Sequence, residues 1–360
     1  MRSVRSPLQE LIQRIVAEKA NLSKTETKFA FGRIFSGNES DIAIGSFLTA
    51  LAMKGESDDE VLGAYEAVRE KENVFGPGVG PSIDICGTGG EALKTFNIST
   101  AAAIVAAASG CRVAKHGNRS MSGPCGSADF LEAVGFDLDS PNERLLNSLD
   151  SMGITFLFAP KFHPLMKNIA NARRSVGIRT ILNIVGPLCN PCVNLKGQLI
   201  GVSNESLLSQ ITNVMKRSNL QRFMVANSQD GFDELTNTSV SRVIYFNQGD
   251  ISSFLIHPQE YDLTLSHKND LIIRSKEECV RVTMEAICGY APEKIVDVVV
   301  LNAGAALLVG NRVDNLIEGI ELARTNIRNG NARAILHELI KKCGNELRFL
   351  EAERSLKKRQ

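Results

Sequence analysis

Three polar segments, each beside a short apolar run, have the composition of a phosphate-binding site. Residues 87–90 (GTGG) follow the apolar run 83–86, residues 97–100 (NIST) precede an alanine-rich run, and residues 115–119 (KHGNR) follow residues 111–114. Glycines let the backbone approach a ligand closely, and the N-terminus of a helix attracts an anion. In a doubly wound sheet the carboxyl ends of neighbouring strands bring such segments into one crevice. The pattern therefore predicts a phosphate site in an α/β fold.

The glycine-rich turn differs from the two standard nucleotide-binding motifs. It contains neither G-x-x-x-x-G-K-[ST] nor G-x-G-x-x-G, which disfavours an ordinary nucleoside triphosphatase and a dinucleotide-dependent dehydrogenase. A GTGG turn alone is as often structural as functional. The prediction therefore depends on all three segments together. We expect Ser99 and Thr100 to cap the following helix and to leave its first N–H groups for an anion.

An acidic segment at residues 230–234 (DGFDE) has the composition of a Mg²⁺ site. Asp233 and Glu234 are adjacent, on a glycine turn just past a predicted strand. Mg²⁺ prefers hard oxygen ligands and shares its coordination shell with water and substrate phosphate. An Asp-Glu pair by itself is usually part of a solvated loop. It gains weight here because phosphate-binding segments accompany it.

The overall composition narrows the class of protein. The 360 residues include 41 Lys and Arg against 40 Asp and Glu, so net charge gives no support to nonspecific nucleic-acid binding. No uncharged apolar run reaches the about 18 residues of a membrane helix, and the N-terminus lacks the sustained apolar stretch of a secretory signal. We expect a cytoplasmic enzyme with neither nucleic acid nor membrane as a partner.

Eight cysteines are scattered along the chain, and we expect them to be structural. Several lie in apolar runs, where a free thiol behaves as a small hydrophobic group. Only Cys189 and Cys192 have the spacing of a redox or metal motif. No second pair and no flanking His complete a zinc set, so a functional site there is disfavoured.

Helical periodicity predicts a small helical domain over residues 1–76. The predicted helices are 7–19, one that begins after a capping box at Ser23 and Glu26, 41–53 and 58–71. Further helices near residues 165–190 are expected to complete this domain. The Gly- and Pro-rich residues 76–81 have the composition of its exit linker.

Residues 77–360 are expected to form a large α/β domain with a mainly parallel sheet, because apolar strands alternate there with helices. The predicted strands are 83–86, 112–114, 154–158, 222–225 and 242–246. Residues 251–273 are expected to continue as antiparallel structure. A strongly apolar helix over residues 296–309 and two amphipathic helices would close the chain.

The motifs GTGG, TFNIST, KHGNR and GSAD together resemble those of anthranilate phosphoribosyltransferases, from about Leu8 to the C-terminal helices. That family shares its fold with pyrimidine nucleoside phosphorylases. The resemblance implies a pentosyl-transferring enzyme of tryptophan biosynthesis. It would move the 5-phosphoribosyl group of phosphoribosyl diphosphate (PRPP) to the amine of anthranilate, with Mg²⁺ as cofactor. It also implies a homodimer formed through the helical domain.

By the same resemblance, the PRPP site combines the glycine turn, the helix N-terminus and the cationic loop. Its expected members are Gly87, Gly90, Glu91, Thr95, Asn97, Ile98, Ser99, Thr100, Lys115, His116, Gly117, Asn118, Arg119, Ser120, Met121, Ser122, Gly123 and Ser127. The expected Mg²⁺ ligands are Ser99, Asp233 and Glu234. Lys115 would meet phosphate as a compact charge. His116 is assigned to binding rather than to proton transfer.

The resemblance also implies an anthranilate site. A guanidinium group is the best partner for a carboxylate, and the family's anthranilate arginine matches Arg173, whereas Arg174 is expected at the surface. Gly87 and Asn118 match further anthranilate contacts, and Pro187 would form an apolar wall. No general base is assigned, because catalysis would rest on positioning and electrostatics.

The chain departs from the family pattern on the PRPP and metal side. The usual Asp-Gly after GTGG is here residues 91–92 (EA), the usual Val-His-Gly is residues 226–228 (ANS), and the loop after KHGNR contains residues 123–125 (GPC). Glutamate keeps the charge and adds a methylene, whereas alanine removes backbone freedom. Arg173 and Asn118 match the family, which favours a diverged but active enzyme.

Two alternatives stay open on the sequence. A diverged paralogue would transfer phosphoribose to another aromatic acid or act on a nucleoside, and the Lys-Gly-Glu-Ser turn at residues 54–57 is compatible with both. A non-catalytic member that binds nucleic acid would need a basic face and a broken metal set. The near-zero net charge and the intact Asp233-Glu234 pair argue against it.

Overall fold

The computed structural model describes residues 6–76, 78–89, 94–120 and 123–357. These residues fold into two units. The first contains residues 6–74, 160–191 and 209–218, and the second contains the other described residues. Each unit is described by itself.

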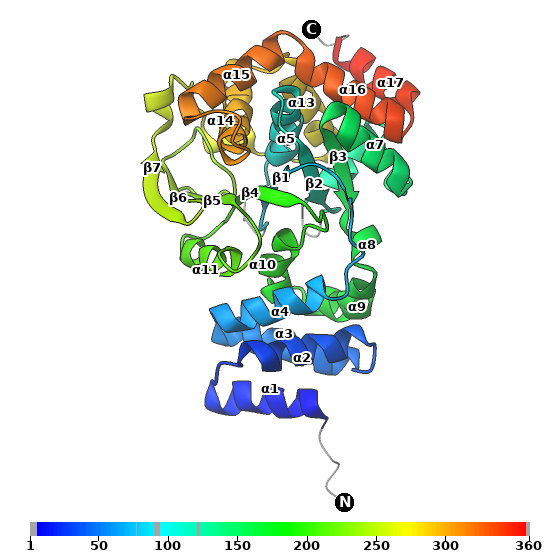
Figure 1. The fold of residues 1–360 in the computed structure, drawn as a ribbon, viewed down its shortest axis with the longest axis vertical. Helices are drawn as coiled ribbons and strands as arrows, with labels where there is room; N and C mark the ends of the chain where they lie inside the picture. Colours follow the sequence, from blue (N-terminus) through cyan, green and yellow to red (C-terminus); the bar gives the residue numbers. More distant parts are fainter. Residues whose placement is uncertain (1–5, 77, 90–93, 121–122, 358–360) are drawn as a thin grey trace, which may run out of the picture. The chain divides into compact units, whose positions relative to one another are not determined.

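The first unit is built from helices. Its main members are α1 (Pro7–Glu18), α2 (Lys24–Phe35), α3 (Asp41–Lys54), α4 (Asp58–Arg69), α9 (Lys167–Val176) and α10 (Ile181–Leu188). Each of α1 to α4 begins after a serine whose hydroxyl accepts a backbone N–H of the first turn, which is why these short helices start where they do. Helix α2 packs on α4, α3 packs on α1 and α9, and α4 packs on α10 (Figure 1).

The second unit contains the sheet. In the described part of the chain, seven strands pair in the order β3-β2-β1-β4-β5-β6-β7. Their bounds are β1 (Ser82–Gly87), β2 (Val113–Gly117), β3 (Ile154–Phe158), β4 (Leu195–Gly201), β5 (Arg222–Ser228), β6 (Ser241–Asn247) and β7 (Asp250–Ile256). Strands β1 to β5 pair in parallel, and β6 and β7 are antiparallel. The predicted mainly parallel sheet is confirmed.

Two apolar helices cover the centre of the sheet. Helix α5 (Ile98–Ala108) lies on β1 and β2, and α14 (Glu293–Val309) lies on β1, β4 and β5. They pack against each other, and Figure 1 shows them side by side. Helix α5 approaches its neighbours closely because most of its buried residues are small; its buried members are Ile98, Thr100, Ala101, Ala102, Ala103, Ile104, Val105, Ala106 and Ala107.

Further helices of the second unit pack on these layers. Helices α13 (Lys276–Cys288), α15 (Leu316–Arg328) and α16 (Asn331–Cys343) contact α5, and α7 (Asn142–Met152) covers β3. The other elements of the described residues, counted over both units, are α6 (Ser127–Ala133), α8 (Ala159–Phe162), α11 (Ser206–Met215), α12 (Lys268–Leu271), α17 (Glu346–Lys357), and the 3₁₀ helices Pro164–Met166 and Pro258–Tyr261. No helix within the described residues is long and apolar enough to cross a membrane.

The sequence analysis missed the central strand β4. Its sequence, LKGQLIG, contains two glycines and therefore lacks the usual composition of a strand. A Cβ at Gly197 would come within 2.9 Å of both Ile83 Cγ2 and Val309 Cγ1. Glycine is thus required where β4 lies beside β1 and packs against α14, and the glycine that this close packing needs conceals the strand in the sequence.

The expectation of antiparallel structure over residues 251–273 was wrong beyond its first part. Among the described residues, β7 is the one strand that pairs in this range, with β6, apart from an isolated bridge between Ile272 and Thr95. Pro258 lacks a backbone N–H for a ladder and begins a 3₁₀ helix, after which α12 follows.

Candidate functional site

The glycine turn after β1 meets the acidic loop after β5. The backbone N–H of Gly89 donates to Oδ2 of Asp233 at 2.7 Å. A Cβ at Gly87 would lie 2.2 Å from the same Oδ2 and 3.0 Å from the Asp233 carbonyl oxygen. The carboxylate can therefore reach the end of β1 only because residue 87 is glycine. The fold thus brings two of the predicted segments together.

The first turn of α5 presents two hydroxyl groups. The helix begins at Ile98, and the side chain of its N-cap, Asn97, makes no capping bond. Ser99 and Thr100 therefore lie inside the first turn and do not cap the helix, contrary to the sequence prediction. Within the described residues, Thr100 Oγ1 is buried without a hydrogen-bond partner. The first N–H groups of a helix also lack intrahelical acceptors, so this turn suits an anion.

Lys115 lies within β2 and not in the loop that the sequence predicted. Strand β2 extends to Gly117, so Lys115 and His116 are strand residues and both are buried. The Lys115 ammonium donates to the carbonyl oxygen of Ile85 at 2.6 Å and to Ser99 Oγ at 3.5 Å. Burial lowers the pKa of Lys115, and the nearby Asp84 carboxylate opposes this shift. The ammonium is thereby fixed beside the first turn of α5.

A buried aspartate supports this part of the sheet. Asp84 is 0% exposed, and its Oδ1 accepts the backbone N–H groups of Ile85 at 2.8 Å and His116 at 3.2 Å. It therefore ties β1 to β2 beneath Lys115. The sequence analysis did not assign a role to Asp84, although a charged residue inside an apolar strand is a usable signal.

The loop between β2 and α6 is closed by an aspartate that the sequence analysis also missed. Asp129 Oδ2 accepts the backbone N–H groups of Ser120 and Gly126, both at 2.9 Å. The signal was present, since the GSAD motif places this Asp in the first turn of α6. Ser127 Oγ donates to the Asn118 carbonyl oxygen at 3.3 Å, which brings two predicted PRPP residues together. Met121 and Ser122 lie outside the described residues.

Arg119 anchors the same loop. Its guanidinium donates to Glu132 at 2.7 Å and to Asp129 at 3.1 Å, and the hydrogen bond with Glu132 is the main cause of its raised pKa. The side chain is exposed, as is Asn118. A role for Arg119 in PRPP binding stays a prediction.

The acidic loop is clamped by a helix residue. Asn302 of α14 accepts the Leu235 N–H at 3.2 Å and donates to the Leu235 carbonyl oxygen at 2.7 Å. It is 2% exposed and fixes the backbone directly after Glu234. The sequence analysis missed Asn302, although a lone Asn within an apolar helix was a signal.

The oxygen donors of this loop fit Mg²⁺. Asp233 is buried and Glu234 is half-buried, and both supply hard carboxylate oxygens. The described residues contain no cluster of three or more His, Cys, Asp or Glu that could hold a metal. A small carboxylate set agrees with a cation that completes its shell with water and phosphate. The glycine cradle at residue 87 keeps Asp233 beside the first predicted phosphate segment.

One of the departures from the family pattern, at residue 227, lies within the described residues and fits its surroundings. Asn227, which replaces the usual His, is buried and donates to the Val202 carbonyl oxygen at 2.7 Å. Gly90 and Glu91 lie outside the described residues, and so does Ala92. Thr95 forms the isolated bridge to Ile272 that leads the chain into α5.

The predicted anthranilate residues are divided between the units. Gly87 and Asn118 lie in the second unit, and Arg173 and Pro187 lie in the first, in α9 and α10. Arg173 is half-buried, burial lowers its pKa, and no carboxylate of the described residues forms an ion pair with it. A partly desolvated guanidinium that has no counter-ion among the described residues favours an anionic ligand. Arg174 is exposed and donates to Asn171 Oδ1 at 2.7 Å, as expected for a surface residue.

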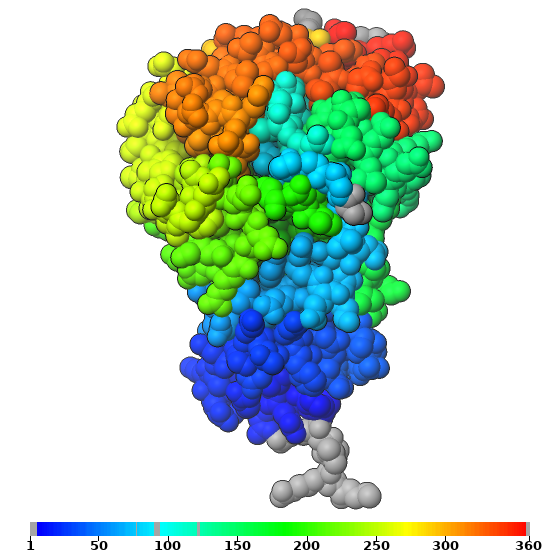
Figure 2. Space-filling view, in the orientation of Figure 1, coloured from blue at the N-terminus to red at the C-terminus, as the bar shows by residue number. Residues whose placement is uncertain are grey.

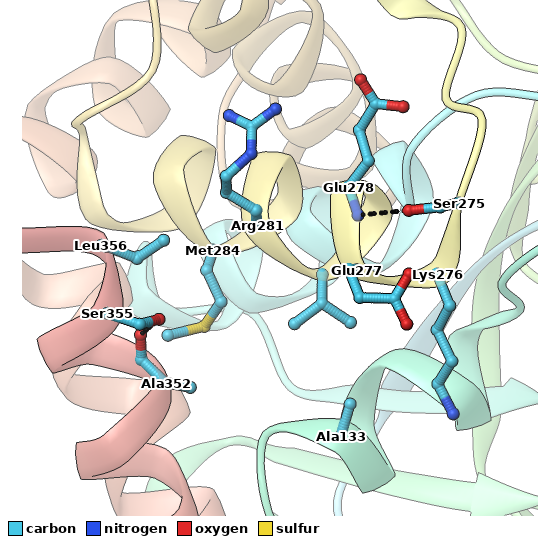
Figure 3. Close-up of a pocket in the computed structure, with 11 residues that line it drawn as sticks. Ala133, Ser275, Lys276, Glu277, Glu278, Arg281, Met284, Ala352, Ser355 and Leu356 are labelled. Carbon is cyan, nitrogen blue, oxygen red and sulfur yellow. Dashed lines mark hydrogen bonds between the residues drawn. The ribbon is translucent and has the colours of Figure 1, made fainter. Parts of the chain in front are cut away.

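A separate cavity of about 530 Å³ lies along α13. Figure 3 shows its lining, which includes Lys276, Arg281 and Met284 of α13 and Leu356 of α17. None of the predicted site residues contributes to it. The cavity is therefore not part of the site described above.

Comparisons with known proteins agree over both units. Residues 9–71 match the helical bundle domain of a glycosyl transferase family, and residues 79–333 match its a/b domain. An anthranilate phosphoribosyltransferase of Alkaliphilus metalliredigens is 42% identical over 334 residues, which cover 93% of this chain and 98% of that protein. A crystal structure of the Thermus thermophilus enzyme of the same name matches with a TM-score of 0.85 and 32% identity, over 94% of this chain and 99% of that one.

The Saccharomyces cerevisiae enzyme of this name, solved in complex with PRPP and Mg, has the same fold. It matches with a TM-score of 0.86 and 23% identity, over 94% of this chain and 98% of that one. The relatives of higher identity, which match nearly end to end, decide the classification. This chain belongs to the anthranilate phosphoribosyltransferase family.

Proposed function

We propose that this chain transfers the 5-phosphoribosyl group of PRPP to the amine of anthranilate, giving N-(5-phosphoribosyl)anthranilate and diphosphate in tryptophan biosynthesis. The observation that carries the proposal is the hydrogen bond from the Gly89 N–H to the Asp233 carboxylate, which joins the GTGG turn to the acidic loop. An enzyme that binds a diphosphate ester together with Mg²⁺ needs its phosphate segment and its carboxylates side by side.

The diphosphate would bind at the first turn of α5. Ser99 and Thr100 supply hydroxyl groups there, and Lys115 supplies a fixed positive charge at its base. Because the ammonium already donates to Ile85 and Ser99, it is preorganised before substrate arrives. Bound Mg²⁺, with Asp233, Glu234 and Ser99 as ligands, would neutralise charge on the departing diphosphate.

In the reaction, the amine nitrogen forms a bond to C1 of the ribose while the bond from C1 to the diphosphate oxygen breaks. The amine then loses one proton. We assign no general base, since the chain would act by holding both substrates in line and stabilising charge. Arg173 would bind the anthranilate carboxylate, with Gly87, Asn118 and Pro187 as further contacts. Its lowered pKa and the lack of an ion-pair partner among the described residues support this role.

The test is a fluorescence assay of anthranilate consumption by the purified chain. We expect loss of fluorescence that requires both PRPP and Mg²⁺, with one diphosphate released for each anthranilate consumed. Calorimetry of PRPP binding accompanies the assay. PRPP binding without consumption of anthranilate would contradict the proposed acceptor, and turnover of a pyrimidine nucleoside with phosphate would indicate the phosphorylase reaction instead.

We further propose that the chain forms a homodimer through helices α1 to α3. Val16, Phe29, Ile42 and Met53 are large apolar residues of these helices, and they are 66%, 51%, 82% and 84% exposed. Figure 2 shows in blue the surface that these helices present. Burial of such residues would favour association. Sedimentation should give a dimer for the parent and a monomer for Ile42→Glu, and a monomeric parent would contradict the proposal.

A cytoplasmic location is also proposed. The structure describes all eight cysteines, and every one of them is a free thiol. Free thiols in this number are typical of a reducing compartment. Fractionation of the source cells with an antibody against the chain would test the location.

A further inference from the structure

Two cysteines far apart in the sequence meet at a single amide group. Cys125 lies in the loop that leads into α6, and Cys279 lies near the start of α13. The Asn97 side-chain amide donates to Cys279 Sγ at 3.0 Å and to Cys125 Sγ at 3.6 Å. The two sulfur atoms are therefore neighbours, and both contact the N-cap residue of α5.

The two thiols have different environments. A hydrogen bond with the Cys279 side chain is the main cause of the lowered pKa of Cys125, and the positive charge of Lys276 contributes to it. Lys276 starts α13 and is labelled in Figure 3. Cys279 is 0% exposed, and its pKa is raised by the hydrogen bond with Cys125 and by burial. Cys125 is half-buried and therefore accessible to a small oxidant.

This difference matches the division of work in a thiol–disulfide exchange. An accessible thiol of lowered pKa attacks first, and a protected neighbour resolves the intermediate. Three buried cysteines differ from Cys125, because burial is the main cause of a raised pKa for Cys111, Cys189 and Cys288. Cys125 and Cys279 are thus suited to a reversible bond.

We propose that Cys125 and Cys279 form a reversible disulfide that weakens the binding of PRPP. The oxidant is a small-molecule disulfide such as oxidised glutathione. The Cys125 thiolate attacks one of its sulfurs, forms a mixed disulfide and releases one glutathione. Cys279 then loses its proton and attacks the Cys125 sulfur, which releases the second glutathione. One protein disulfide replaces one glutathione disulfide, and a reducing thiol reverses both steps.

The location of the pair explains the expected effect, which rests on the proposed function. Cys125 lies two residues after Gly123 and two before Ser127, inside the loop expected to wrap the diphosphate. A sulfur–sulfur bond of about 2 Å is much shorter than a contact between two thiols. Its formation would draw this loop toward α13. It would also change the acceptors of Asn97, at the start of the helix that holds Ser99 and Thr100.

The bond itself is tested by peptide mapping. The full chain is equilibrated with mixtures of reduced and oxidised glutathione, its remaining thiols are blocked with iodoacetamide, and the tryptic peptides are analysed by mass spectrometry. We expect one linked pair that contains Cys125 and Cys279 and disappears after dithiothreitol treatment. Glutathione attached to Cys125 with no linked pair would overturn the proposal. So would a linked pair that involves other cysteines.

The effect on PRPP is tested with the same samples. Oxidation should raise the dissociation constant or KM of PRPP roughly tenfold, the equivalent of one lost hydrogen bond to a charged group. Dithiothreitol should restore the original value. Cys125→Ser and Cys279→Ser should each abolish the sensitivity, whereas Cys288→Ser, a buried cysteine of the same helix, should keep it.

Two outcomes separate this inference from the proposed function. A linked pair that leaves PRPP affinity unchanged would overturn the regulatory effect. An inactive reduced chain would count against the proposed function alone, because peptide mapping and PRPP calorimetry read the disulfide and its effect without turnover.

Discussion

The backbone N–H of Gly89 donates to Asp233 Oδ2 at 2.7 Å, although the two residues are 144 positions apart in the chain. This bond connects the turn after β1 with the loop after β5, on either side of the central strand β4. One carboxylate therefore has two tasks, since Asp233 both holds the glycine turn and belongs to the expected Mg²⁺ site. The two tasks are separable by substitution.

Asp233→Asn should weaken the affinity for Mg²⁺ while it leaves the fold intact. The amide oxygen can still accept the Gly89 N–H, but the negative charge is lost. Removal of an outer-shell partner alone costs roughly 10-fold to 100-fold in metal affinity, so the half-saturating Mg²⁺ concentration should rise at least tenfold. Mg²⁺ titration of activity and scanning calorimetry measure the two effects. Asp233→Ala should lower the melting temperature as well, and equal melting temperatures for both variants would contradict the structural task.

Asn302→Ala should affect both stability and Mg²⁺ dependence. It leaves the buried N–H and carbonyl groups of Leu235 without their partner, at a cost of about 1–3 kcal/mol of unfolding free energy. The loosened backbone next to Glu234 should raise the Mg²⁺ concentration needed for activity. Denaturant unfolding and Mg²⁺ titration provide the measurements.

Asn326→Ala is the matched control for Asn302. Asn326 is also a buried helix asparagine, but it donates to Ser109 Oγ and the Leu322 carbonyl oxygen and not to the acidic loop. Asn326→Ala should lose a similar amount of unfolding free energy as Asn302→Ala, but the Mg²⁺ concentration that it needs for activity should not change. Equal Mg²⁺ effects in both variants would show that Asn302 acts through general stability.

The sequence predicted those elements whose own residues are typical of a helix or a strand. Strand β3 is recognisable because it is a mostly apolar run, ITFLF, which packs beside β2 and under α7. Strand β4 is not, because Gly197 is selected by its contact with Ile83 and Val309, which are remote in the sequence. Polar Lys115 and His116 resembled a loop because their burial depends on partners in β1.

The same distinction applies to the candidate site. Glycine turns and a helix start have local signatures, so their segments were found. Asp129 and Asn302 were missed because their task is to hold backbone groups elsewhere in the chain, and only the fold reveals those partners. The roles of the site residues toward PRPP and anthranilate stay predictions, since they depend on ligands.

Arg173→Ala should raise the KM of anthranilate much more than it changes kcat. A hydrogen bond to a charged group contributes about 1.5–3 kcal/mol, which corresponds to roughly 10-fold to 150-fold in KM. Arg173→Lys should restore only part of the loss, because an ammonium lacks the planar fork of guanidinium. Arg174→Ala removes the neighbouring exposed arginine and should leave KM unchanged. A shift in the KM of PRPP instead of anthranilate would contradict the assignment.

His163 provides a pH-dependent contribution to stability in the first unit. Its Nε2 lies 2.9 Å from the Cys189 carbonyl oxygen, which suits a neutral ring that donates from Nε2. The side chain is 7% exposed, and burial lowers its pKa to about 4. In an unfolded chain a histidine has a pKa of about 6.5. Between these values the unfolded chain binds more protons than the folded chain, so stability must fall as pH falls.

His163→Gln should reduce this acid sensitivity. The full stabilising contribution of the neutral ring is present above pH 6.5 and is lost as pH falls toward 4, which amounts to about 3 kcal/mol for a shift of this size. Glutamine can donate to the Cys189 carbonyl oxygen but does not titrate. The unfolding free energy of the variant should therefore change less over this pH range. Denaturant unfolding at several pH values between roughly 7.5 and 4.5 gives the slope of unfolding free energy against pH for each variant. His267→Gln removes an exposed histidine as the control. Parallel slopes for the parent and His163→Gln would show that the acid sensitivity arises from other groups.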